Sequence, residues 1–199
     1  MKASLLALTL FACVSPKEQS IESPFVEDTG SGVAVDTDDE TQQDPIDLID
    51  GADLPAGTSP CREPVLGLVT SVIDGDTIKV ETGRGIETVR LIGIDTPEVD
   101  HSGPDDECFG EESKSFLNDL VYQHKVWLTF DAECDDYYDR TLAYVHVGTD
   151  DEDFIQRMML QGGWASTLVV EPNTSFRTLF QSDQSVAQSA NAGLWGECG

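Results

Sequence analysis

The sequence contains few basic residues and no long apolar run. Its 199 residues include 11 Lys and Arg against 38 Asp and Glu, which gives a formal charge of -27 at pH 7. Such a charge keeps a protein soluble but repels polyanions, so it counts against nucleic-acid binding. Gly-x-Ser-x-Gly and Gly-Lys-Ser/Thr motifs are absent, and the histidines at positions 101, 124 and 146 lack a metal-binding spacing. These absences exclude serine hydrolases with a nucleophile elbow, P-loop nucleotide binders and histidine metal centres.

The N-terminus has the pattern of an export signal. The apolar run over residues 3–12 is too short to span a bilayer and has the length of a signal-peptide core. It ends in Leu10-Phe11-Ala12-Cys13, which resembles the lipobox of bacterial lipoproteins. Residues 1–13 are therefore predicted to be a signal peptide, with Cys13 as the lipid anchor to a membrane. The alternative is a plain secretory signal cut near Ala12, which gives a secreted protein.

A long acidic segment follows the signal. Residues 14–60 show no sustained apolar periodicity, and their acidic residues face Lys17 as the lone basic one. Such a segment cannot bury enough apolar surface to offset the entropy of ordering it, and its like charges repel. We predict a disordered tether over residues 14–60, followed by a folded domain over residues 61–199.

The folded domain alternates short strands with amphipathic helices. Apolar alternation and turn residues predict five strands, and helical spacing predicts three helices. The expected strands are Val65–Ile73, Thr77–Glu81, Ile86–Ile94, Lys125–Phe130 and Arg140–Val147, and the expected helices are Gly110–Tyr122, Asp153–Gln161 and Ser175–Ala190. A three-stranded meander, a helix and two more strands suit an α+β, mainly β fold, a five-stranded Greek-key barrel of the OB type with three helices.

Two acidic strand ends carry the candidate chemistry. Asp74-Gly75-Asp76-Thr77 starts one strand, and about twenty residues later the segment from Arg90 to Glu98 ends another strand in Asp95-Thr96-Pro97-Glu98. Either turn by itself is typical of solvated acids. Because the two strands are neighbours in a meander, however, their carboxylates can surround one hard cation, which prefers oxygen ligands.

Three motifs in this order resemble the staphylococcal nuclease, or thermonuclease, family. They are Asp-Gly-Asp-Thr, Arg-(four residues)-Asp-Thr-Pro-Glu, and Asp139-Arg140-Thr141-Leu142-Ala143-Tyr144. The resemblance covers roughly residues 65–196. It implies an OB-type barrel and a calcium-dependent phosphodiesterase that acts on DNA, RNA or both and leaves 3′-phosphate ends.

The resemblance also implies a role for each matching residue. The carboxylates of Asp76 and Asp95 and the backbone carbonyl of Thr96 would hold Ca²⁺. The carboxylate of Glu98 would activate water. Arg90 and Arg140 would bind the phosphate, and Tyr138 would contact the substrate. The expected protein is a monomer whose partners are a nucleic-acid substrate and the membrane.

Departures from the family pattern keep a second hypothesis open. Asp139 stands where a glycine commonly precedes the second arginine, so it is a potential partner for Arg140. Leu168 and Val170 stand where the staphylococcal enzyme has tyrosines near the base, which predicts weaker or different base stacking. The alternative is therefore a catalytically weak module of the same fold that binds nucleic acid or protein at the cell surface.

Four cysteines remain once Cys13 is assigned to the anchor. Cys61, Cys108, Cys134 and Cys198 allow three disulfide pairings. We predict Cys61 with Cys198, which would staple the two ends of the domain, and Cys108 with Cys134, which would brace the site from both sides.

Overall fold

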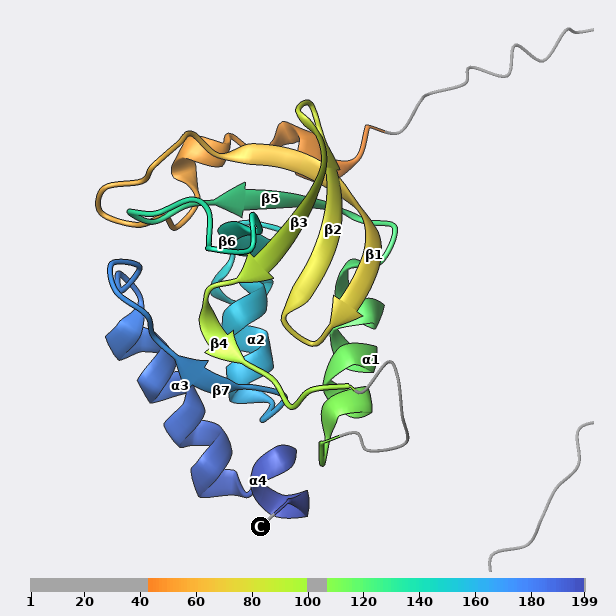
Figure 1. The fold of residues 1–199 in the computed structure, drawn as a ribbon, viewed down its shortest axis with the longest axis vertical. Helices are drawn as coiled ribbons and strands as arrows, with labels where there is room; N and C mark the ends of the chain where they lie inside the picture. The colour runs from red at the N-terminus through yellow and green to blue at the C-terminus, as the bar shows by residue number, and fades with distance from the viewer. Residues whose placement is uncertain (1–42, 100–106, 199) are drawn as a thin grey trace, which may run out of the picture. The chain divides into compact units, whose positions relative to one another are not determined.

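A closed five-stranded barrel forms the centre of the protein in the computed structural model, which describes residues 43–99 and 107–198. Around the barrel the strand order is β1-β2-β3-β6-β5 (Figure 1). Neighbours pair antiparallel except β3 and β6, which pair in parallel and close the barrel. The strands are β1 (Val65–Asp74), β2 (Thr77–Thr82), β3 (Gly85–Leu91), β5 (Lys125–Thr129) and β6 (Thr141–His146). The predicted α+β fold with a five-stranded OB-type barrel is confirmed.

The third predicted strand divides into two near its end. β3 ends at Leu91, and β4 (Gly93–Asp95) leaves the barrel to pair antiparallel with β7 (Ser166–Leu168) in a separate two-stranded sheet. Gly93 has φ 87°, and a Cβ there would lie 2.4 Å from a ring carbon of Phe180. Glycine is therefore required both by the backbone angle and by the packed ring. The prediction of one continuous strand was wrong at this point.

The helices lie where the prediction placed them in the sequence. They are α1 (Gly110–Val121), α2 (Ile155–Gln161), α3 (Arg177–Ala190) and α4 (Leu194–Glu197). The first three match the predicted helices to within two residues at each end, and the short α4 was not predicted. Within the described residues, none of the helices has the length and apolar character needed to cross a membrane.

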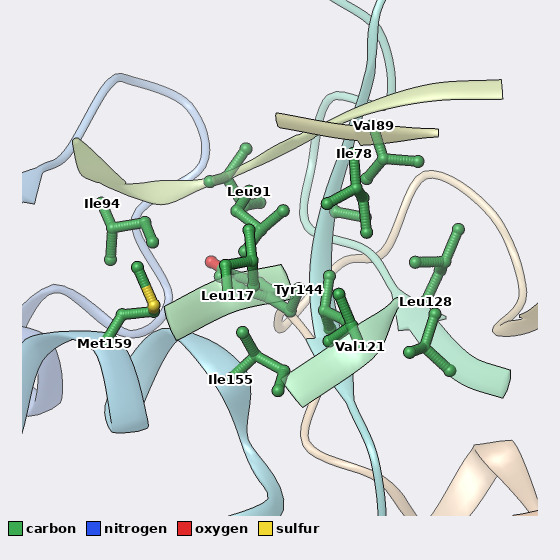
Figure 2. Close-up of a cluster of buried hydrophobic side chains, with 14 of the residues drawn as sticks. Ile78, Val89, Leu91, Ile94, Leu117, Val121, Leu128, Tyr144, Ile155 and Met159 are labelled. Carbon is green, nitrogen blue, oxygen red and sulfur yellow. The ribbon is translucent and has the colours of Figure 1, made fainter. Parts of the chain in front are cut away.

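The hydrophobic core fills the barrel and extends to three of the helices, α1, α2 and α3. Figure 2 shows Leu117 and Val121 of α1 and Ile155 and Met159 of α2 among the side chains of the strands. All four are fully buried, as are their strand neighbours. Burying each such side chain stabilises the fold by about 1.5–3 kcal/mol, so the core fixes the strand ends that carry the candidate site.

The last part of the predicted tether belongs to the folded domain. Residues 43–60 fall in the same compact unit as the barrel and include short 3-10 helices at Pro45–Leu48 and Gly51–Asp53. The Trp127 indole donates to the Ile46 carbonyl (3.2 Å), and the Thr129 hydroxyl donates to the Pro55 carbonyl (2.6 Å). The boundary at residue 60 was therefore wrong, because two strand side chains hold this acidic segment along β5. Residues 14–42 of the tether and the signal peptide with Cys13 lie outside the described residues.

Both predicted disulfide pairings were wrong. The structure joins Cys61 to Cys134 and Cys108 to Cys198. The N-terminal segment runs along β5 and past its end, where the Cys61 backbone N–H donates to the Asp131 carbonyl (2.7 Å). Cys61 is thus placed beside the loop that follows β5, which carries Cys134.

The C-terminus packs against the beginning of α1 instead. Trp164 stacks on Phe109 and Phe116 with ring centroids 5.1 and 4.6 Å apart. The Leu194 backbone N–H donates to the Gly163 carbonyl (2.9 Å), which fixes α4 next to this stack. Cys198, directly after α4, is therefore close to Cys108 and bonded to it, and not to Cys61 as predicted.

His146 is a buried histidine at the end of β6. Its side chain is 1% exposed, and its Nε2 lies 3.0 Å from the Thr129 hydroxyl. Burial disfavours the charged imidazole and lowers the pKa of His146 to about 4, against the weaker opposing effects of the Pro55 backbone and Asp153. An unfolded chain would bind a proton at a pKa near 6.5.

This lowered pKa predicts a loss of stability in mild acid. As pH falls from 6.5 to 4 the unfolded state takes up a proton at this site before the folded state does, so unfolding becomes easier by about 3 kcal/mol. Urea denaturation should show this decline for the wild type and a smaller one for His146→Gln. Equal pH dependence in the two proteins would rule out His146 as the cause.

Candidate active site

Two acidic turns meet at one end of the barrel, as the sequence predicts. Asp76 at the start of β2 is 4% exposed, and its carboxylate accepts hydrogen bonds from the Thr96 backbone N–H (3.2 Å) and the Thr77 hydroxyl (2.9 Å). A Cβ on Gly75 would lie 2.8–2.9 Å from side-chain atoms of Thr96. Glycine therefore allows the β1–β2 turn to approach the segment that follows β4.

Arg90 links the carboxylates of the two turns. It pairs with Thr77 in the β2–β3 ladder, and its guanidinium forms salt bridges with Asp76 and with Asp95 (2.8 Å). The Arg90 and Asp76 side chains are 13% and 6% exposed, so their contact is largely shielded from water, whereas Asp95 is 46% exposed. Burial raises the pKa of Asp76 above its ordinary value, although the Arg90 charge acts in the opposite direction. The arginine thus holds two acids that would otherwise repel each other.

Glu98 lies at the edge of this group and is exposed. Its pKa is raised first by partial burial and then by the nearby charges of Asp76 and Asp74. Several carboxylates therefore share a small region with one arginine, and a cation would relieve their repulsion.

The residues fit a divalent cation in ligand type and in charge, although the acids of this region are not gathered around one point. Across residues 43–99 and 107–198, no three acidic, histidine or cysteine side chains form a ready ligand cluster. Two of the three predicted ligands, Asp76 and Asp95, are instead engaged with Arg90. The oxygen donors present are of the kind that hard cations such as Ca²⁺ prefer.

The second arginine borders the same cleft as the first. Parallel pairing places Arg90 of β3 opposite Leu142 of β6, two residues after Arg140. Arg90 and Arg140 both line a cleft of about 590 Å³ that also touches Leu168 and Val170. Tyr138 is 75% exposed, and its ring lies 5.5 Å from the Arg140 guanidinium carbon. The two predicted phosphate-binding arginines therefore face one cavity.

A profile of the family described as staphylococcal nuclease homologue matches residues 88–197. The chain belongs to the staphylococcal nuclease family. Of the predicted site residues, the matched range contains Arg90, Asp95, Thr96, Glu98, Tyr138 and Arg140, and Asp76 precedes it.

Curated relatives of this chain include other members of the family. The chain is 37% identical over 128 residues to a thermonuclease of Staphylococcus intermedius, an alignment that covers 64% of this chain and 74% of that protein. It is 31% identical over 140 residues to a thermonuclease of Staphylococcus hyicus, covering 70% and 80%. It is 36% identical over 129 residues to endonuclease YncB of Bacillus subtilis, covering 64% of this chain and 60% of that protein. The family and these relatives support nuclease, that is phosphodiesterase, activity.

Asp136 is a site residue that the sequence reasoning missed. Its carboxylate accepts hydrogen bonds from Nε of Arg140 (2.7 Å), from the Arg140 backbone N–H (3.0 Å) and from the Tyr138 backbone N–H (2.8 Å). Burial would raise the pKa of Asp136, but these hydrogen bonds from Arg140 and Tyr138 outweigh it and lower the pKa. The contact uses one of the five N–H donors of the guanidinium, so it orients Arg140 rather than blocking it.

The sequence pointed to Asp139 instead of Asp136. Asp139 has φ 58°, the left-handed conformation that explains the glycine expected at this position of the family pattern. The glycine of the family pattern thus reflects the left-handed backbone conformation at this position, and the carboxylate of Asp139 is not the partner of Arg140. Arg140 finds its carboxylate partner four residues earlier in the chain, on the other side of a tight turn.

We predict that Asp136→Asn lowers kcat by about 10-fold, because Arg140 loses a charged hydrogen bond worth about 1.5–3 kcal/mol. The matched control is Asp139→Asn, which keeps a residue that tolerates the left-handed conformation and should retain kcat within about twofold. Initial rates on single-stranded DNA compare the variants. An equal loss in both would place the effect in the turn as a whole and not in the contact between Asp136 and Arg140.

Proposed function

We propose that this member of the staphylococcal nuclease family is a calcium-dependent enzyme that hydrolyses phosphodiester bonds of DNA or RNA and leaves 3′-phosphate ends. The observation that carries the proposal is the placement of Arg90 and Arg140 on one cleft, with Asp76, Asp95 and Glu98 beside Arg90. Arginines suited to phosphate and carboxylates suited to a cation and to water lie at one end of the barrel.

The acids divide between ion binding and proton transfer. The carboxylates of Asp76 and Asp95 and the carbonyl of Thr96 would hold Ca²⁺, which when bound neutralises the charge of the phosphate and orients it. Glu98 is exposed, so a water molecule can reach its carboxylate. Glu98 removes the proton of this water as the oxygen attacks phosphorus, and the 5′-oxygen leaves on the opposite side.

The arginines act on the oxygens that gain charge in the transition state. A guanidinium donates two parallel hydrogen bonds to a phosphate, which the point charge of a lysine cannot do. Arg140 is held for this by Asp136 at Nε (2.7 Å). Arg90, which lines the same cleft, is fixed by its salt bridges to Asp76 and Asp95. Fixed donors of this kind stabilise developing charge without having to reorganise.

Digestion of defined substrates tests the proposal. Purified protein is incubated with single- and double-stranded DNA and with RNA, in calcium or in excess chelator. We expect cleavage only with calcium, and products that a DNA polymerase cannot extend until a phosphatase removes the 3′-phosphate. Undiminished cleavage in chelator would contradict the calcium requirement, and directly extendable ends would contradict the proposed direction of cleavage.

The acidic surface predicts an unusual salt dependence. From residue 61 onward acidic residues still outnumber basic ones by nearly three to one. The resulting field should slow the capture of a polyanion when the Debye length is about 30 Å and much less when it is about 10 Å. We therefore expect kcat/KM to rise between about 0.01 and 0.1 M salt, measured at constant calcium with a neutral osmolyte as control. A steady fall from the lowest salt upward would contradict this.

We further propose that the protein is an exported monomer anchored to a membrane through Cys13, or secreted if the lipobox is not used. The support is the apolar run and lipobox-like sequence of residues 1–13, together with four downstream cysteines that suit an oxidising compartment when paired. Cells grown with labelled palmitate should label the wild type and not Cys13→Ser. Equal labelling of both would exclude this anchor.

A further inference from the structure

Tyr137 is the most exposed large hydrophobic side chain in the part of the chain that the structure describes. It is 94% exposed, although folded proteins usually cover an aromatic ring of this size. Its ring contacts Tyr138 edge to face, with centroids 5.6 Å apart. Tyr137 also lines the cleft that Arg90 and Arg140 border. A bare ring at the edge of a phosphate-binding cleft is a surface on which a flat ligand can stack.

The turn that carries Tyr137 is braced, so the ring is presented at a fixed place. The Asp139 backbone N–H donates to the Asp136 carbonyl (3.2 Å), and Asp135 forms a β-bridge with Thr141. The Cys61–Cys134 disulfide ties the segment just before the turn to the N-terminal segment. A ligand that stacks on this ring does not have to order a loose loop, which would weaken binding.

Apart from the arginines, the cleft suits a nucleobase better than a phosphate. Its lining includes the apolar residues Leu142, Leu168 and Val170, of which the last two are 43% and 62% exposed. Glu133 and Asp135 also line it, and their carboxylates repel a phosphate but accept hydrogen bonds from the amino groups of adenine, cytosine or guanine. The phosphate therefore belongs at the arginines and the base beyond them.

We propose that Tyr137 stacks on an unpaired base next to the phosphate that Arg140 binds. The inference rests on the proposed nuclease function. A base in a duplex has both faces covered by its neighbours, whereas an unpaired base can stack on an aromatic ring with a gain of about 1–3 kcal/mol. This gain does not depend on charge, and it offsets the weak attraction that a strongly acidic protein has for a polyanion.

The test uses short single-stranded oligonucleotides with one cleavable phosphodiester, their other linkages being methylphosphonates. They carry either adenine or an abasic residue on each side of that phosphodiester. Tyr137→Ala should lower kcat/KM by about 5- to 150-fold on the adenine substrate, mainly through KM, and leave the abasic substrate unchanged. Tyr137→Phe keeps the ring and should match the wild type on both substrates. The same oligonucleotides, dye-labelled, give Kd by fluorescence anisotropy.

The outcomes separate this inference from the proposed function. An equal loss on adenine and abasic substrates would show that Tyr137 acts through the turn and not on a base, which overturns the inference. No loss on adenine, or an equal loss with Tyr137→Phe, would also overturn it. If the wild type cleaves neither substrate, the proposed function fails. Weaker anisotropy binding of Tyr137→Ala to the adenine oligonucleotide alone would then still support the stacking role.

Discussion

Glu98→Gln is expected to lower kcat by a factor of about 10²–10⁴, the usual contribution of a positioned general base. Glutamine keeps the size of the side chain but cannot take the proton of the attacking water. Because Glu98 is exposed and its carboxylate packs into no core, the melting temperature should stay unchanged. Substrate affinity should also remain near that of the wild type, since the arginines are untouched. Steady-state kinetics on single-stranded DNA in calcium give kcat and KM, and thermal unfolding gives the melting temperature.

The matched control for this variant is Glu112→Gln. Glu112 is also an exposed glutamate, and it lies in the first turn of α1. Both substitutions remove one negative charge from a very acidic protein, so a change due to overall charge would appear in both. If Glu98→Gln retained more than about a tenth of the wild-type kcat, another group would have to accept the proton.

Removing the Cys108–Cys198 disulfide is expected to lower the free energy of unfolding by about 4 kcal/mol. The bond joins residues 90 positions apart, and a cross-link of this span restricts the unfolded chain strongly. For a domain of this size the melting temperature should fall by about 8–16 °C in Cys108→Ser with Cys198→Ser. Thermal unfolding under non-reducing conditions measures the change.

A second double variant distinguishes the observed pairing from the one that the sequence suggested. Cys108→Ser with Cys134→Ser breaks both disulfides of the structure and leaves Cys61 and Cys198 as free thiols. It should therefore be the less stable of the two double variants and expose two more reactive thiols than the wild type. Two more reactive thiols than the wild type in the variant that lacks Cys108 and Cys198 would contradict the pairing described above.

The barrel was predictable from the sequence because its signals are local. The alternation of Ile78 and Val80 with Lys79 and Glu81 corresponds to alternate burial in β2, and α1 presents Leu117 and Val121 at helical spacing. The division of β3 from β4 was missed because Gly93 is needed for contact with Phe180, which lies 87 residues later in the chain. Local patterns cannot reveal such a contact.

The same distinction holds for the site. The motifs predicted that Asp76, Arg90, Asp95, Thr96 and Glu98 would come together, and the structure does bring them together, whereas their roles stay predictions. Asp136 was missed because its contact with Arg140 depends on a left-handed residue in the turn between them. Residues 43–60 are folded because Trp127 and Thr129 donate hydrogen bonds to their backbone. The acidic, polar composition of this segment had predicted a disordered tether.

The parallel pairing of β3 with β6 makes the spacing of the two arginines depend on the register of these strands, and not on the number of residues that connect them. Arg90 is opposite Leu142, and this register sets the distance between the two arginines across the barrel wall. A slip of one residue in β3 would turn the Arg90 side chain to the other face of the sheet. Insertions or deletions in the connection between the two strands leave that spacing intact as long as the register is kept. The loops between β3 and β6 of this chain can therefore change in length without moving the arginine pair.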